Sequence, residues 1–171
     1  MTKKVSSHSD GASPNASLSM TVLMTPDKSN FSGNVHGGVV LKYLDLVAYT
    51  CATRYASNYA VTLSVDRVVF REPIHVGELV TFDASINNTG RTSMEVGIRV
   101  TTEDLTTGGV RHTNSCYLTM VTVDAQGAPV LVPPWVPVTA VQRRRQAAAI
   151  RRRQLRSEME RREQEIRAED P

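Results

Sequence analysis

One long helical segment, set among strand patterns, constrains the fold of this chain more than any other feature. From Gly38 to about Ala56, apolar residues recur at spacings of three and four without an interrupting proline. This period predicts a helix of about 18 residues whose apolar face is wide enough to be largely buried. After Asn58 the pattern changes to strands, so a single helix must serve the whole core of this part of the chain.

Five segments on either side of this helix read as β-strands. Each alternates apolar and polar residues, and most are rich in Val, Ile, Thr and Tyr, which is typical of half-buried strands. The predicted strands are Leu18–Met24, Ala60–Phe70, Glu78–Asn87, Ser93–Thr101 and Arg111–Val123. One helix after the first strand and four strands after the helix predict an α+β fold with one antiparallel sheet and a central helix.

The charge of the chain is divided unevenly along its length. Of 20 Lys and Arg and 17 Asp and Glu, the last 29 residues hold ten and six, so they carry a net +4 and the rest a net −1. Because the rest of the chain is nearly neutral, the basic total is poor evidence for nucleic-acid binding, and no nucleic-acid partner is expected. We expect four parts: a disordered leader at 1–17, a domain at 18–132, a Pro-rich connection at 133–140 and a basic helical tail at 141–171.

Several functional classes are excluded by what the sequence lacks. No apolar run approaches the roughly 20 residues that span a bilayer, and the N-terminal residues lack the apolar centre of a secretory signal. We therefore expect a cytoplasmic protein with no membrane partner, whose Cys51 and Cys116 are buried free thiols. His112 and Cys116 are possible metal ligands, but four residues of strand span roughly 13 Å, so no metal site is expected. The glycine-rich phosphate motifs and G-x-S-x-G are absent.

A polar, glycine-rich loop runs directly into the helix and is the most distinctive motif. Gly37 and Gly38 stand at the predicted helix start, where unpaired backbone amides and the helix dipole favour a negative oxygen. A thioester or ester carbonyl becomes such an oxygen when it is attacked. A tight turn that requires two glycines explains the same pair without a ligand. From the residues alone, both interpretations remain open.

Asp45 is the only acidic residue within the apolar helix. At about 100° per residue it lies at the rim of the buried face, where a carboxylate is costly unless it is partnered or used. It is about 10–12 Å along the axis from the Gly-Gly end, too far to act on a carbonyl bound at its own helix N-terminus. A second subunit could bring an Asp45 to that carbonyl. An interface aspartate that caps a backbone group is the structural alternative.

The order of these motifs resembles that of hotdog-fold acyl-CoA thioesterases, in the group that contains the bacterial YciA-type enzymes and the tandem-domain brain acyl-CoA hydrolase. The resemblance covers residues 18–123 and rests on NFSGNVHGG at 30–38, LD at 44–45, VTLSVD at 61–66, FREPI at 70–74, VGE at 76–78 and GRTSMEV at 90–96. It implies a hotdog fold, with a five-stranded antiparallel sheet wrapped around one long helix. It also implies hydrolysis of acyl-CoA to a free fatty or short-chain acid and coenzyme A. Since coenzyme A is part of the substrate, no cofactor is implied.

The resemblance further implies which residues act. Hotdog thioesterases are similar in building their sites across a dimer interface, so a homodimer would hold two sites, and a hexamer made as a trimer of dimers is the implied assembly. Asp45 would act as general base, or alternatively as nucleophile. Asn34 would orient the water or the carbonyl, and the substrate oxygen would be bound by His36, Gly37 and Gly38.

Coenzyme A itself would be bound, by the same resemblance, at the turn of Arg91, Thr92 and Ser93. A guanidinium such as that of Arg91 suits bidentate binding of a phosphate. As a bare pattern, this segment is an ordinary turn that leads into a strand.

The alternative function is a non-catalytic acyl-CoA-binding regulator on the same fold. Such regulators resemble this domain but append a DNA-binding helical module, usually at the N-terminus, and the first 17 residues are too short and too polar for one. Hydratases and dehydratases on hotdog folds pair a histidine with an acid in other motifs. Acyl-CoA hydrolysis is therefore the expected function.

Overall fold

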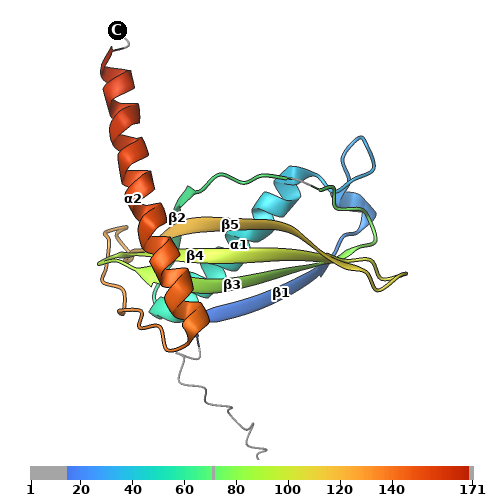
Figure 1. Cartoon of the computed structure of the whole chain (residues 1–171), viewed down its shortest axis with the longest axis horizontal. Coiled ribbons are helices and arrows are strands. Elements are labelled where there is room, and N and C mark those ends of the chain that lie inside the picture. Colours follow the sequence, from blue (N-terminus) through green and yellow to red (C-terminus); the bar gives the residue numbers. More distant parts are fainter. Residues whose placement is uncertain (1–14, 71, 170–171) are drawn as a thin grey trace, which may run out of the picture. The chain divides into compact units, whose positions relative to one another are not determined.

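One five-stranded antiparallel sheet with a helix packed against it forms the first part of the molecule (Figure 1). The structure is a computed structural model that describes residues 15–70 and 72–169. The strand order is β1-β3-β4-β5-β2, and helix α1 contacts every strand. These elements are α1 (Gly37–Ala56), β1 (Ser17–Leu23), β2 (Ala60–Val65), β3 (Leu79–Thr89), β4 (Ser93–Glu103) and β5 (Val110–Thr122). The predicted α+β hotdog arrangement is confirmed.

The core lies between α1 and one face of the sheet. Helix positions three and four apart are buried, among them Val40, Leu44, Val47, Ala48 and Cys51. They meet every second residue of the central strands, including Val80, Phe82 and Ala84 of β3 and Val96, Ile98 and Val100 of β4. The helical and strand periods that the sequence displays are therefore two sides of one apolar interface.

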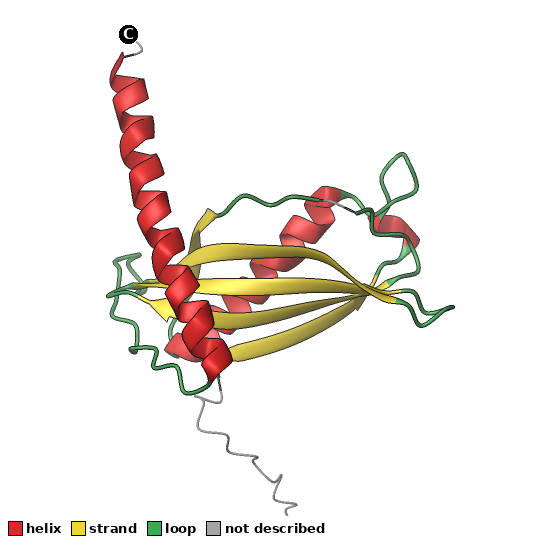
Figure 2. Ribbon diagram, viewed as in Figure 1, coloured by secondary structure: helices red, strands yellow, loops and turns green. Residues whose placement is uncertain are grey.

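The predicted strand over Ala60–Phe70 is wrong in its second half. β2 ends at Val65, and residues 66–70 belong to the long loop that leads towards β3 (Figure 2). β2 is an edge strand that pairs only with β5, so little holds it once that pairing stops. Farther along the loop, the side chain of Asn114 donates a hydrogen bond from Nδ2 to the Val69 carbonyl, at 3.2 Å. This bond ties the loop to β5 where backbone pairing between strands is absent. The other predicted elements begin and end within two residues of those observed.

The chain divides after Trp135 into two compact units. The second unit contains α2 (Ala140–Glu169), the predicted C-terminal helix. A capping box starts this helix: Thr139 Oγ1 accepts the Gln142 N–H, and Gln142 Oε1 accepts the Thr139 N–H, at 3.1 and 2.9 Å. Most of the expected leader at 1–17 lies outside the described residues, and the four-part division stays a prediction.

Candidate active site

The loop before α1 ends in a histidine that caps the helix. His36 has an extended backbone, and its Nδ1 accepts the N–H of Gly38 at 2.9 Å. The helix therefore begins at Gly37, one residue earlier than predicted, and Gly38 has a partner for its amide. No described residue accepts the N–H of Gly37. Of the two amides expected to hold a substrate oxygen, the one at Gly37 is the open one.

Asn30 organises the turn at the other end of this loop. Its side-chain oxygen accepts the backbone N–H groups of Ser32 and Asn34 at 2.9 and 3.2 Å, and its own N–H donates to the Asn34 carbonyl at 2.7 Å. Gly33 supports the turn with φ +78°, a left-handed conformation that favours glycine. Because both backbone bonds use the oxygen, the side-chain NH₂ of Asn30 remains available as a donor. It has no partner within the described part of the chain.

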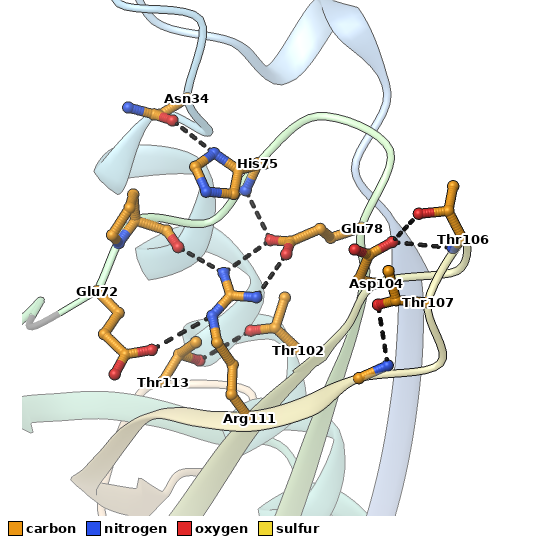
Figure 3. Close-up of polar contacts among 12 residues, drawn as sticks. Asn34, Glu72, His75, Glu78, Thr102, Asp104, Thr106, Thr107, Arg111 and Thr113 are labelled. Carbon is orange, nitrogen blue, oxygen red and sulfur yellow. Dashed lines mark hydrogen bonds and ion pairs between the residues drawn. The ribbon is translucent and has the colours of Figure 1, made fainter.

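A second loop, residues 72–78, is bound to the first through His75 (Figure 3). The ring Nδ1 of His75 donates to Asn34 Oδ1 at 2.8 Å, and the Val35 N–H donates to the Ile74 carbonyl at 2.8 Å. The 72–78 loop is held in turn by Arg111, whose guanidinium contacts both carboxylate oxygens of Glu78. Asn34, expected to act on the substrate, thus has its oxygen engaged within the protein.

The ion pair of Glu78 and Arg111 predicts a pH dependence of stability. Burial alone raises the pKa of Glu78, but hydrogen bonds from Arg111 and from the His75 backbone, with the charge of Arg111, outweigh it and leave that pKa below its ordinary 4.5. Above pH 4.5 the stabilisation is complete, and it is lost as the pH falls through the depressed pKa. The unfolding free energy of Glu78→Gln, measured with urea, should therefore lie below that of the wild type at neutral pH, with a gap that closes in acid.

The control for that measurement is Glu103→Gln, which removes a carboxylate of β4 outside the network. Its unfolding free energy should follow the wild-type pH curve more closely. A gap for Glu78→Gln that stays constant from neutral pH into acid would contradict the assignment of the ion pair.

Asp45 is held by a residue that lies outside the expected site. The Thr62 hydroxyl, on β2, donates to Asp45 Oδ1 at 2.5 Å. Asp45 is exposed in the single chain, so within one chain its carboxylate stays in contact with water. Asp45 also lies eight residues beyond Gly37, about 12 Å along the axis. The structure therefore does not bring Asp45 to the loop of its own chain.

The expected coenzyme A turn lies at the opposite end of the sheet from the start of α1. Gly90 to Ser93 joins β3 to β4, whereas the loop before α1 adjoins the beginning of β3. β3 has eleven residues, so the two ends are about 33 Å apart. Arg91 is exposed on this turn, and the Thr92 carbonyl accepts the Thr122 N–H at 3.1 Å. Within one chain, this turn is separate from the candidate carbonyl site.

Thiol and metal chemistry find no support in the described residues. Burial raises the pKa of both Cys51 and Cys116 to about 12, so neither thiol is a thiolate nucleophile at neutral pH. Among the described residues, no group of three or more His, Cys, Asp or Glu is placed to hold a metal ion. No described helix is both long and apolar enough to cross a bilayer.

Sequence reasoning missed four side chains that the structure places in or beside the site: Asn30, Thr62, His75 and Arg111. Asn30 carried a signal, because an asparagine that begins a glycine-containing turn commonly bonds the backbone two residues on. Thr62 and Arg111 carried none, since their partners lie 17 and 33 residues away.

Comparison with known proteins agrees with this fold. Residues 32–108 match the model of the thioesterase superfamily. Protein VdlD of Helicobacter pylori is 50% identical over 140 residues, which are 82% of this chain and 80% of that protein. The crystal structure of an apo-hexameric acyl-CoA thioesterase superposes with a TM-score of 0.82 and 36% identity, over 85% of this chain and 93% of the other.

Acyl-CoA hydrolase of Staphylococcus aureus is a further structural relative. Its complex with butyryl coenzyme A, coenzyme A and coenzyme A disulfide superposes with a TM-score of 0.79 and 26% identity, over 90% of this chain and 96% of the other. Variants of that enzyme with one aspartate or one asparagine replaced by alanine give TM-scores of 0.77 and 0.80 at 25% identity, over 89% and 90% of this chain and 95% and 94% of theirs. The chain belongs to the hotdog-fold acyl-CoA thioesterase family.

Proposed function

We propose that this chain hydrolyses acyl-CoA at sites shared by two subunits, with the start of α1 from one subunit and Asp45 from the other. The Asp45 carboxylate takes a proton from water as the water oxygen attacks the thioester carbon. The oxyanion that forms is stabilised by the open amide at Gly37. Collapse of the tetrahedral intermediate breaks the carbon–sulfur bond and releases the acid, and the departing coenzyme A thiolate takes the proton that Asp45 had accepted, which regenerates the Asp45 carboxylate.

The observation that carries this proposal is the setting of Asp45 in an exposed apolar stripe. Leu41 and Tyr49, four residues before and after it on α1, are 41% and 36% exposed. On the neighbouring edge strand, Leu63 and Val65 are 67% and 46% exposed. Apolar surface of this kind is typical of subunit interfaces, and a second copy that covers it would remove water from Asp45.

A second copy also explains why the distances within one chain are unsuitable. A two-fold dimer presents the same surface from both subunits, so each α1 start can face the Asp45 of the partner. The similar acyl-CoA thioesterase that is hexameric supports extending the assembly to three such dimers. The partner can likewise supply Arg91, Thr92 and Ser93 to coenzyme A.

Two free, buried thiols accord with a cytoplasmic location.

Two asparagines of the loop compete for the role of polarising the carbonyl. In the S. aureus hydrolase the replaced asparagine lies fifteen residues before the replaced aspartate. Asn30 lies fifteen residues before Asp45, whereas Asn34 lies eleven before it. Asn30 also keeps a free NH₂ group, while the oxygen of Asn34 is bonded to His75. We therefore assign the donor role to Asn30, with Asn34 supporting it, and His36 acts as the helix cap.

The proposal is tested by a panel of acyl-CoA substrates that differ in chain length. The expected result is release of one coenzyme A thiol for each acid formed, followed with a thiol reagent. The buried Cys51 and Cys116, whose pKa values are raised to about 12, should add little to this signal. If every substrate binds and none is cleaved, the chain is instead an acyl-CoA-binding regulator.

A further inference from the structure

The loop before α1 is tied to a distant strand by four linked side chains, Arg111, Glu78, His75 and Asn34, which we call the clasp. Arg111 stands near the start of β5, with Glu78 in the turn before β3. The side chain of Glu78 is only 9% exposed, and that of Arg111 is 31% exposed. The clasp joins segments separated by 33 and 41 residues.

Arg111 binds the 72–78 loop at three places. Its guanidinium contacts both carboxylate oxygens of Glu78, with Nη2 at 2.9 Å from Oε2, and Nη2 also donates to the Pro73 carbonyl at 2.6 Å. Nε lies 3.3 Å from Glu72 Oε2. A planar guanidinium with five donors makes this set of bonds, whereas a lysine ammonium offers a single point charge.

Glu78 is hydrogen-bonded to His75, and His75 is hydrogen-bonded to the turn that Asn30 and Asn34 form before α1. Glu78 Oε2 accepts the His75 backbone N–H at 2.7 Å, and the His75 ring holds Asn34 Oδ1 at 2.8 Å (Figure 3). The Asn34 N–H in turn bonds the side-chain oxygen of Asn30 at 3.2 Å. Hydrogen bonds, joined through the covalent structure of His75 and Asn34, therefore connect Arg111 to the side chain proposed to polarise the substrate.

We infer that Arg111 and His75 are positioning residues, which hold the Asn30 donor in place through the clasp. This inference rests on the proposed function, because the donor matters only if a carbonyl is bound there. Besides stabilising the fold, a guanidinium–carboxylate pair with several hydrogen bonds fixes the relative positions of the groups that it joins. When a group that stabilises the transition state is held loosely, the catalysed reaction becomes slower.

The test separates positioning from simple stabilisation by using His75, which is exposed and dispensable for the core. His75→Ala should lower kcat about tenfold, the loss of roughly one hydrogen bond, and leave KM within about twofold. His75→Asn places an NH₂ group where Nδ1 stood and should restore most of the lost kcat. Full activity in His75→Ala, or no recovery in His75→Asn, would overturn the inference.

Hydrogen exchange on the full chain supplies a readout that does not depend on catalysis. Backbone amides of residues 30–38 should exchange about tenfold faster in both His75→Ala and Arg111→Lys. The matched control is His112→Ala, since His112 adjoins Arg111 on β5 but its ring bonds Ser115 Oγ, at 2.9 Å, and no member of the clasp. Unchanged exchange in both clasp variants would refute the clasp. If the wild type cleaves no acyl-CoA while exchange still rises, the proposed function fails and the catalytic part of the inference fails with it.

Discussion

Replacing Asp45 by alanine should lower kcat for acyl-CoA hydrolysis about a thousandfold, the middle of the range for losing a general base. Because this carboxylate is the only acidic group on α1, no neighbour on the helix can take its place. Thr62 holds one of its oxygens in position. Since Asp45 is exposed in the single chain, its removal should not unfold the domain. The measurement is release of coenzyme A thiol at saturating substrate, with the thermal midpoint recorded for each variant.

Two further variants sharpen this prediction. Asp45→Asn keeps the size of the side chain and an oxygen for Thr62 but cannot take a proton, so it should be nearly as impaired as alanine. Asp83→Ala, which removes an exposed carboxylate from β3, should retain wild-type activity. Turnover by Asp45→Ala close to that of the wild type would remove Asp45 from the mechanism.

Mixing two inactive variants should restore activity if each site is shared between subunits. Asn30→Ala and Asp45→Ala damage opposite halves of a site, so a mixed dimer has one site with both changes and one with neither. Random association of equal amounts makes half of the dimers mixed, and about a quarter of all sites are then intact. Activity should therefore rise from a low background to about a quarter of the wild-type value after co-expression.

The control for this experiment is co-expression of Asp45→Ala with a differently tagged Asp45→Ala, which should remain inactive. Mixed dimers that purify through both tags yet have no activity would show that the site lies within one chain. Repeating the mixture with Asn34→Ala in place of Asn30→Ala compares the two asparagines directly. A severe loss in Asn34→Ala alone, with Asn30→Ala active, would return the donor role to Asn34.

Much of the fold follows from local patterns. The apolar spacing from Val40 to Tyr55 and the alternation within β3 and β4 are properties of adjacent residues, and they predict the elements within two positions. β2 is the exception, because the end of an edge strand depends on its one neighbour, β5. Its alternation continues past Val65, whereas the pairing ends with one last bond from the Asp66 N–H to the Tyr117 carbonyl, at 2.9 Å.

The helix start shows how a candidate site changes once side chains are placed. Gly37 and Gly38 read as two equivalent amides in the sequence, yet the His36 ring takes the one at Gly38. Asp45 and the glycines are both recognisable from sequence, but their separation along α1 requires a second subunit for joint action. Local pattern identifies the groups, and geometry decides which of them can meet.

The single helix among strands, the isolated Asp45 and the glycine-rich loop were determined by the sequence itself, because each depends on residues next to one another in the chain. The clasp, the Thr62 contact and the open amide at Gly37 were decided only by the tertiary structure. Arg111 reaches Glu78 across 33 residues because the registers of β3 with β4 and of β4 with β5 bring the start of β5 near the start of β3. His75 reaches Asn34 across 41 residues because their two loops pair in an isolated bridge. Side chains that meet through register leave no periodic signal in the sequence.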